Sequence, residues 1–212
     1  MFSLLKHDPS SIGKFLYPEI KWRTGNNKIL LTIDDSPNTT ITPLILKILS
    51  EAKVEALFFC IGRNIKQTGS LVNEITAENH ILGNHSFNHI NLRKLKDEDL
   101  VKELDECSDL LSNAADKPIK YFRPPYGKFN SSVVSAAKAK GMSTVLWSLL
   151  TYDYKNDINL VKFAYRYLKN NSIVVLHDNT KNSSIIENSL YKLFEEVEKN
   201  NFKFGSPVEC LK

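Results

Sequence analysis

The most informative stretch of the chain is Leu30-Leu31-Thr32-Ile33-Asp34-Asp35-Ser36-Pro37, where an apolar, β-prone run over residues 29–33 ends on two adjacent carboxylates. Apolar runs of this length are typical of a parallel strand that is covered on both faces. Ligands of α/β folds bind at the carboxyl ends of such strands. Adjacent acids repel each other, and successive side chains diverge at a strand end, so one acid could hold a cation while its neighbour acts as a base. Asp-Asp-Ser-Pro-Asn alone is also good turn chemistry, so the rest of the chain has to decide between these interpretations.

Length and composition indicate one ordinary globular domain. The chain has 212 residues, of which 42% are hydrophobic and 25% charged, enough for one substantial core and short for two domains. The net charge of +4 and the pI near 8.8 are mild, and the lysines are scattered, so we expect no nucleic-acid partner. Cys60, Cys107 and Cys210 lie far apart without CxxC spacing, which favours neither a disulfide framework nor a zinc knuckle.

The N-terminal region carries no targeting signal that we recognise. Residues 1–8 contain no apolar stretch of signal-peptide length, and no later segment reaches membrane-spanning length. We therefore expect a soluble, cytoplasmic chain without a membrane span, although a trimmed chain would look the same. Residues 1–27 are expected to form an N-terminal flap that packs Phe15, Leu16, Tyr17 and Trp22 against the body.

The rest of the chain, residues 28–212, alternates strand-like and helix-like segments with short connections. Strands are expected at residues 29–33, 56–61, 81–84, 121–123, 144–147 and 172–176, with a last short strand at 202–204. Helices are expected between them, the first with Thr42 as its N-cap and Pro43 at its first position. This alternation predicts a single α/β domain built on a parallel sheet, either open or closed.

Polar side chains follow the expected strands one after another. Asp34 and Asp35 follow the first strand, and a pair of histidines follows the third. Arg123, Asp153 and His177 come at or after the ends of the fourth, fifth and sixth strands. Because the carboxyl ends of parallel strands meet on one side of a barrel, we expect these residues to converge on one cleft. The whole set supports an active site better than any one of its members does.

The metal-ligand candidates are the histidines of His85-Ser86-Phe87-Asn88-His89. Histidines four residues apart lie on one helical or turn face, which suits two imidazoles on one divalent ion. With one carboxylate they would form a two-His, one-Asp set that leaves positions open for water and substrate, as catalytic sites do. The alternative is that His85 caps the strand and His89 lies on the surface.

His177 is placed to act as a general acid, because imidazole titrates near neutral pH. Asp153 could hold and charge it, although the adjacent Asp178 competes for the same pairing. Arg123 could orient a carboxylate base and keep it in its charged form. A histidine at a strand end can also be merely structural, so the interpretation depends on the neighbouring motifs.

With these residues placed, the chain resembles polysaccharide deacetylases of carbohydrate esterase family 4, the NodB homology domain, over residues 28–205. Five family motifs match in order: Thr-Phe-Asp-Asp-Gly-Pro at 32–37, His-Ser/Thr-x-x-His at 85–89, Arg-x-Pro-Tyr-Gly at 123–127, Asp-Trp at 153–154 and Leu-x-His at 176–177. Each motif is weak alone, but all of them in the right order are strong. The resemblance implies a distorted, incomplete (β/α)7-type barrel of mostly parallel strands.

The resemblance also implies a role in proton transfer for four of the matched residues. Asp34 would be the general base, and Arg123 would orient it. His177 would be the general acid, and Asp153 would tune it. These roles agree with those that the residue types suggest at the ends of strands.

Metal and substrate binding are implied by the same resemblance. Asp35, His85 and His89 would bind one divalent metal, usually zinc, with cobalt, nickel or manganese as alternatives. The backbone N–H of Tyr126 would help to hold the oxyanion. The acetyl methyl pocket would be lined by Tyr154 and Leu176, and the full set of expected substrate-binding residues is Pro125, Tyr126, Trp147, Tyr154 and Leu176.

Two positions depart from the family pattern, but neither removes a chemical group. Ser36 replaces the glycine of the first motif, which would strain a serine if that position needs a positive φ. Tyr154 replaces tryptophan and keeps an aromatic wall. We therefore expect a metal-dependent hydrolase that removes N-acetyl groups from N-acetylglucosamine-containing polysaccharide or oligosaccharide of peptidoglycan or chitin type, releasing acetate. The alternatives are a deacetylase or deformylase of a small non-polymeric amide, and a catalytically silent carbohydrate-binding relative.

Overall fold

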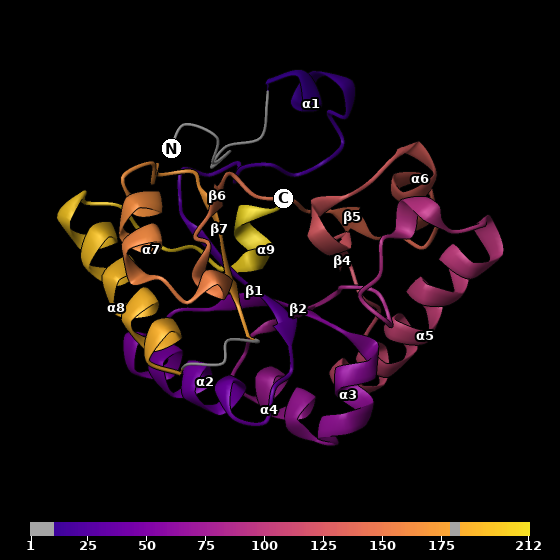
Figure 1. The fold of residues 1–212 in the computed structure, drawn as a ribbon, viewed down its shortest axis with the longest axis horizontal. Helices are drawn as coiled ribbons and strands as arrows, with labels where there is room; N and C mark the ends of the chain where they lie inside the picture. The colour runs from indigo at the N-terminus through magenta and orange to yellow at the C-terminus, as the bar shows by residue number, and fades with distance from the viewer. Residues whose placement is uncertain (1–10, 179–182) are drawn as a thin grey trace.

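The computed structural model describes residues 11–178 and 183–212 and is built on a seven-stranded sheet (Figure 1). All strand pairs are parallel, in the order β5-β4-β3-β2-β1-β7-β6. The strands are β1 (Leu30–Ser36), β2 (Ala56–Cys60), β3 (Ile81–Asn84), β4 (Tyr121–Phe122), β5 (Ser143–Thr144), β6 (Leu149–Leu150) and β7 (Ile173–His177). Because β1 lies inside the sheet, its two acids lie away from both edges.

Helices cover the outer face of the sheet. Successive side chains along a strand point to opposite faces, so they enter two different hydrophobic clusters. Leu31 and Ile33 of β1 pack with the helices in a large outer cluster. Leu30 points the other way and packs with Leu57 and Ile173 inside the barrel. This burial on both faces explains why the strands are continuously apolar, as the sequence predicts. The fold is thus the α/β domain on a parallel sheet that the alternation of elements predicts, in the form of the incomplete (β/α) barrel that the family resemblance implies.

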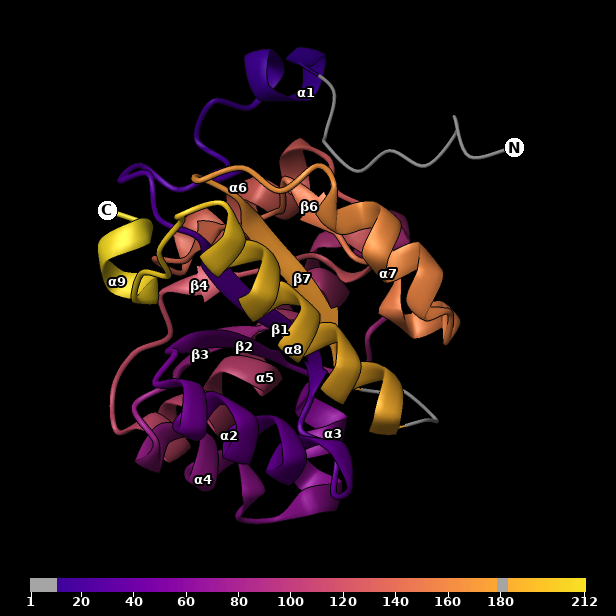
Figure 2. The same ribbon diagram turned by 90° about the vertical axis from the view of Figure 1, so that its left-hand side faces the viewer.

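Figure 2 shows α8 crossing in front of β1 and β7 with α7 beside it, on the outer face of the sheet. The short C-terminal helix α9 (Pro207–Cys210) lies instead against the inner cluster, to which its residue Cys210 belongs. None of the described helices is both long and apolar enough to cross a bilayer. Their bounds are α1 (Ser11–Leu16), α2 (Ile41–Ala52), α3 (Gly62–Thr68), α4 (Leu71–Ala77), α5 (Asp97–Ala115), α6 (Ser131–Ala139), α7 (Ile158–Tyr165), α8 (Ser183–Lys199) and α9 (Pro207–Cys210), with 3-10 turns η1 (Leu92–Lys94), η2 (Pro125–Gly127) and η3 (Asp153–Lys155).

The segment before β1 bridges the gap between the two sides of the open barrel. The Lys21 N–H donates to the Thr144 carbonyl (2.9 Å), and the Leu146 N–H donates to the Lys21 carbonyl (2.8 Å). Two residues later, Arg23 forms an antiparallel bridge with Ser172, just before β7. This segment therefore ties the β5 side to the β7 side.

The packing predicted for the N-terminal flap is confirmed for two residues and wrong for two others. The rings of Tyr17 and Trp22 lie 5.0 and 6.1 Å from the ring of Phe129. Phe15 and Leu16 are instead 85% and 62% exposed at the end of α1. The helix stands away from the body in Figure 1, which leaves their side chains without a surface to cover. Residues 1–10 of the expected flap lie outside the described residues.

Two other local predictions need correction. Helix α2 begins at Ile41 with Thr40 at its N-cap position, so Thr42 lies inside the helix. The cause is Asn38, whose side-chain oxygen accepts hydrogen bonds from the N–H groups of Thr40 (2.9 Å) and Ile41 (3.1 Å). The hydroxyl of Thr42 accepts a hydrogen bond from the Asn38 N–H (2.7 Å). Side-chain capping from two residues upstream thus starts the helix earlier than expected.

The predicted strand at residues 144–147 is divided in the structure. Strand β5 ends at Thr144, Val145 pairs with the N-terminal segment, and the unpredicted β6 follows at Leu149–Leu150. The last strand predicted, at residues 202–204, is reduced to a single bridge between Ile29 and Phe204. Both differences occur at short segments on the edge of the sheet, where the backbone pairs with residues that are distant in the sequence.

Candidate active site

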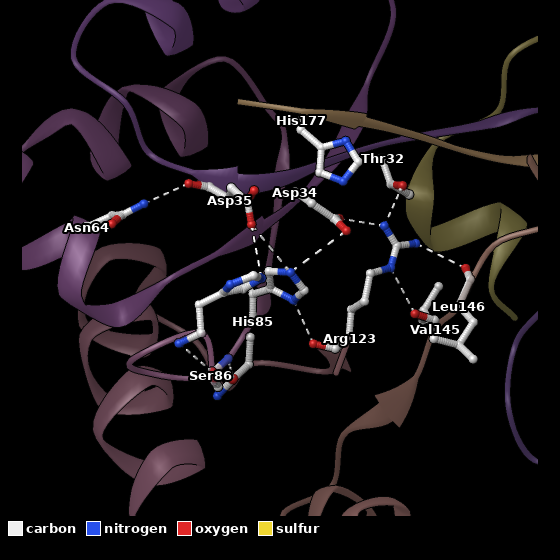
Figure 3. Close-up of polar contacts among 12 residues, drawn as sticks. Thr32, Asp34, Asp35, Asn64, His85, Ser86, Arg123, Val145, Leu146 and His177 are labelled. Atoms are coloured by element: carbon white, nitrogen blue, oxygen red, sulfur yellow. Dashed lines mark hydrogen bonds and ion pairs between the residues drawn. The ribbon is translucent and has the colours of Figure 1, made fainter. Parts of the chain in front are cut away.

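A cleft of about 340 Å³ opens at the carboxyl end of the sheet. Its walls come from the ends of β1, β6 and β7 and from the loops that follow β3, β4, β5 and β6. The lining residues are Asp34, Asp35, His85, His89, Tyr126, Gly127, Trp147, Leu150, Tyr154, Val175 and His177. Figure 3 shows the acids, the histidines and Arg123 pointing toward one another. The predicted convergence at the strand ends is therefore present.

Both acids of β1 face the same side, although neighbouring residues of a strand normally point to opposite faces. Asp35 has a φ of 70°, and the pairing with β2 shifts register between Asp34 and Ser36. As a result, the Nε2 atom of His85 lies 3.8 Å from Asp34 Oδ2 and 3.7 Å from Asp35 Oδ1. The expected divergence of the two carboxylates is wrong. Asn64 holds the left-handed turn by donating to the Asp35 carbonyl (2.8 Å).

Asp35, His85 and His89 form a set with the geometry of a metal centre. One ligand atom from each residue lies within 4.8 Å of the others. His89 Nε2 is 3.3 Å and His85 Nε2 is 3.7 Å from Asp35 Oδ1. Ligand atoms on a tetrahedral ion with bonds of about 2.1 Å lie about 3.4 Å apart, so the set fits a divalent ion such as zinc.

One of the two histidines is oriented by a hydrogen bond, and the other has a lowered pKa. His85 Nδ1 donates to the Arg123 carbonyl (2.7 Å), which turns the Nε2 atom of the same ring toward Asp35. Burial and the neighbouring His85 lower the pKa of His89 to about 4, against the opposing effect of the two acids. His89 is therefore a neutral imidazole at pH 7, the form that binds metals.

Asp34 is held by a fully buried arginine. One Arg123 nitrogen donates to Asp34 Oδ1 (2.6 Å) and to the Thr32 hydroxyl (2.8 Å). The other donors reach the carbonyls of Val145 and Leu146, each at 3.0 Å. Burial alone would raise the pKa of Asp34, but Arg123, followed by two histidines, lowers it below its usual value. Asp34 is thus a carboxylate at neutral pH, and Thr32, which we did not single out, helps to orient its partner.

His177 is held by Asp153 in a two-point contact. Its Nδ1 lies 2.9 Å from Asp153 Oδ1, and its backbone N–H donates to Asp153 Oδ2 (2.7 Å). Burial would lower the pKa of His177, but Asp153, with smaller contributions from the acids of β1, raises it to about 9. The hydroxyl of Thr151 donates to Asp153 Oδ1 (2.8 Å). No motif pointed to Thr151, because a lone threonine carries no sequence signal of this role.

Asp178 does not compete for His177, since its carboxylate faces away from the cleft toward α2. It accepts hydrogen bonds from Ser36 Oγ (2.7 Å) and from the Thr42 hydroxyl. Ser36 is fully buried, and the left-handed residue of this turn is Asp35 rather than Ser36. The strain considered for a serine at this position is therefore absent, and its hydroxyl has a partner.

The aromatic walls of the cleft pack on the histidines. Tyr126 has a φ of 59° and donates from its hydroxyl to the His89 carbonyl (3.1 Å). The ring of Tyr154 meets that of His177 edge-on at 4.9 Å. Trp147 lies against Gly127, where any Cβ would come within 2.4 Å of the indole.

Two expected substrate-binding residues lie elsewhere. Pro125 is buried and is not among the lining residues, and Leu176 belongs to the core beneath the helices. Val175 and Leu150 line the cleft instead. The period of two along a strand identifies Val175, because the residue two positions before His177 shares its face.

One cleft of a parallel α/β barrel thus holds a candidate metal-ligand set, a buried carboxylate paired with an arginine, and a histidine paired with an aspartate, an arrangement that suits a metal-dependent hydrolase. The model of the family described as "Polysaccharide deacetylase" matches residues 21–145. The chain therefore belongs to the polysaccharide deacetylase family, as the motifs indicated.

Similar proteins extend the match beyond residue 145. The chain is 33% identical over 199 residues to a peptidoglycan-N-acetylglucosamine deacetylase of Bacillus cereus, covering 91% of this chain and 93% of that relative. It is 32% identical over 173 residues to a peptidoglycan-N-acetylmuramic acid deacetylase of Bacillus subtilis, covering 77% and 66%. Among solved structures, a family 4 pseudoenzyme from Bacillus anthracis has a TM-score of 0.81 at 26% identity, covering 91% of this chain and 69% of that one.

Proposed function

We propose that this protein hydrolyses the N-acetyl groups of N-acetylglucosamine units in a peptidoglycan- or chitin-type glycan. The observation that carries the proposal is that one cleft holds both a candidate base and a candidate acid. Asp34 is held by Arg123, and His177 is held by Asp153. The similarity to relatives named as peptidoglycan deacetylases supports the substrate class.

Asp35, His85 and His89 would hold the divalent ion. Two imidazoles and one carboxylate suit zinc, with cobalt, nickel or manganese as alternatives for the same donors. When bound, the ion would polarise the acetamide carbonyl and acidify the attacking water. Three protein ligands leave room for both water and substrate.

The proton transfers are assigned to the groups on either side of this set. Asp34 takes a proton from the water that attacks the acetamide carbon, and Arg123 keeps Asp34 in its carboxylate form. As the C–N bond breaks, His177 gives a proton to the leaving nitrogen, because an amine anion is a poor leaving group. The products are acetate and a free amino sugar.

The acetyl group itself is assigned to the part of the cleft that is lined by aromatic and aliphatic side chains. The Tyr126 backbone N–H would donate to the carbonyl oxygen as negative charge develops there. Trp147, Tyr154 and Val175 present apolar surface from neighbouring loops and strands, which suits the methyl group. Val175 takes the place that we expected for Leu176.

The test is acetate release from N-acetylglucosamine oligomers and peptidoglycan fragments, before and after chelation and zinc addition. We expect release that is lost with chelator and restored by zinc. Release from a small amide alone, with no activity on oligomers, would favour the small-amide alternative. Zinc binding without release from any substrate would contradict the proposed activity and favour a silent relative, which the complete set of titratable groups argues against.

The variant Asp34→Asn distinguishes the proposed base role of Asp34 from metal binding. A general base contributes about 10²–10⁴-fold, so turnover should fall by about that factor while zinc affinity changes little. Steady-state kinetics and a zinc competition assay measure the two quantities. Retained turnover would remove Asp34 from the base role.

A further inference from the structure

We propose that Glu103 is a positioning residue for the metal ligands, because its carboxylate clamps the loop that carries His85 and His89. Glu103 lies on α5, outside the cleft and outside every motif that we singled out. The inference rests on the proposed metal site and assigns the residue that keeps the loop in its ligand-presenting shape.

The loop needs such support because its backbone is locally unfavourable. Ser86 has a φ of 62° and His89 a φ of 55°, both in the left-handed region that residues other than glycine rarely adopt. The second of these is itself a ligand, so its backbone conformation sets where its imidazole points. Residues in such conformations persist only when surrounding contacts determine them.

Glu103 supplies these contacts from one side. Its Oε2 accepts hydrogen bonds from the consecutive N–H groups of Phe87 (3.0 Å) and Asn88 (2.9 Å). Its Oε1 accepts one from the Asn88 side-chain amide (2.6 Å). Glu103 is only 7% exposed, so these bonds are shielded from water. A carboxylate that accepts several short bonds in a buried position is a strong and directional anchor.

The start of α3 holds the same loop from the other side. The N–H groups of Gly62 and Arg63 donate to the carbonyls of Ser86 (3.1 Å) and Phe87 (2.9 Å). A Cβ at Gly62 would lie 2.4 Å from the ring of Phe87, so the approach is close. The middle of the loop thus directs the carbonyls of Ser86 and Phe87 to α3 and the N–H groups of Phe87 and Asn88 to Glu103. The N–H groups at its two ends, of Ser86 and His89, have acceptors in Asn84 Oδ1 and Ser86 Oγ. Removing the Glu103 carboxylate would therefore leave the N–H groups in the middle of the loop without an acceptor.

Two substitutions of Glu103 test whether its hydrogen-bond acceptors, and not its size or its charge, keep the loop in place. Glu103→Ala removes every acceptor, whereas Glu103→Gln keeps one oxygen for the two backbone N–H groups. Val197→Ala is the matched control, a truncation of a buried side chain on α8, which lies on the other side of the fold from α5 (Figure 1). A merely structural role would make Glu103→Ala and Val197→Ala behave alike.

The first experiment measures zinc affinity by competition with a chromophoric chelator. Outer residues that orient metal ligands typically change affinity by about 10–100-fold, so Glu103→Ala should bind zinc at least about 10-fold more weakly than the wild type. Glu103→Gln should recover most of this loss, and Val197→Ala should bind zinc as the wild type does. Equal zinc affinity in Glu103→Ala and the wild type would overturn the proposal.

The second experiment uses the metal-free protein and does not depend on the metal site. The amide hydrogens of Phe87 and Asn88 should exchange at least about 10-fold faster in Glu103→Ala, because an opened loop exposes them to water. Unchanged exchange of these amides would overturn the clamp. If Glu103→Ala does not fold, Asn88→Ala removes the single bond from the Asn88 side chain to Glu103, and the exchange of the same two amides should rise by a smaller factor; unchanged exchange in that variant would count against the clamp. Failure of the wild type to bind zinc would instead contradict the proposed metal site.

Discussion

The two sides of the cleft are held in place by different forces. The side proposed to bind the metal, called the metal side here, consists of Asp35, His85 and His89. Asp35 and His89 have left-handed backbone, Asn64 donates to the Asp35 carbonyl, and His85 donates to the Arg123 carbonyl. The side proposed to transfer protons, called the proton-transfer side here, consists of two ion pairs, Arg123 with Asp34 and His177 with Asp153.

The difference indicates what each side needs before substrate arrives. The proton-transfer side carries its own counter-charges, so its geometry and protonation states are set in the protein alone. The metal side gathers a carboxylate and two imidazoles that an ion would draw together, since bound cations are commonly the largest local charge in such sites. We therefore expect the first side to govern the stability of the metal-free protein and the second to govern its response to metal.

The largest effect expected from this comparison is the loss of Arg123. Arg123→Met leaves Asp34 buried without its counter-charge, which should lower the free energy of unfolding by about 3–5 kcal/mol. His89→Ala, on the metal side, should cost clearly less in the metal-free protein, because the His89 side chain is 16% exposed. Urea unfolding of the metal-free variants measures both.

The double variant Arg123→Met/Asp34→Asn is the control for this prediction. It removes both charges together and should recover part of the stability lost in the single variant, because no uncompensated charge stays buried. If His89→Ala destabilises the protein as much as Arg123→Met does, the division between the two sides is wrong.

Zinc should act on the metal side alone. At a free concentration about 100 times Kd, a ligand that binds only the native state adds about 2.7 kcal/mol to the free energy of unfolding. We expect this gain in the wild type and in Asp34→Asn and its absence in His89→Ala. Unfolding curves with and without zinc provide the measurement. Loss of the gain in Asp34→Asn would show that Asp34 is a metal ligand.

The pH dependence of activity should be governed by the proton-transfer side. His177 must be protonated to serve as an acid, and its pKa is raised to about 9, so kcat/KM should decline as the pH rises through that region. Asp153→Asn removes the charge that raises this pKa, which should move the alkaline limb by about 1–3 pH units toward lower pH. An unmoved limb would exclude Asp153 from tuning His177.

The proton-transfer side was also the more predictable of the two. Asp34, Arg123 and His177 stand at or next to strand ends, and the register of parallel strands brings such positions together. Their residue types then suggest which charges pair. The competition between Asp153 and Asp178 for His177 stayed open until the structure showed Asp178 facing α2.

For the metal side, the sequence predicts which residues come together but not the contacts that hold them there. The spacing of His85 and His89 indicates a ligand pair, but nothing in the sequence indicates that Asp35 takes a positive φ and turns toward them. Glu103 lies on a helix whose pattern shows only an amphipathic surface, and its partners are backbone N–H groups. Hydrogen bonds from a side chain to distant backbone groups cannot be predicted from the spacing of residues in the sequence.

The smallest effect concerns Ser36, which lies where the two sides meet. Ser36 follows Asp35 of the metal side, and its hydroxyl donates to Asp178, the residue after His177. Ser36→Ala removes one of the two hydroxyl bonds to Asp178, and the Thr42 bond remains, so the free energy of unfolding should fall by only about 1 kcal/mol. Turnover and zinc affinity should stay within about 3-fold of the wild type, because each side keeps its own anchors; this corresponds to less than about 1 kcal/mol. Kinetics and zinc competition on the same preparation check this, with Ser36→Gly as the variant that restores the family residue. A 10-fold loss of turnover with intact zinc binding would show instead that this hydroxyl couples the two sides, and the separation drawn between them would fail.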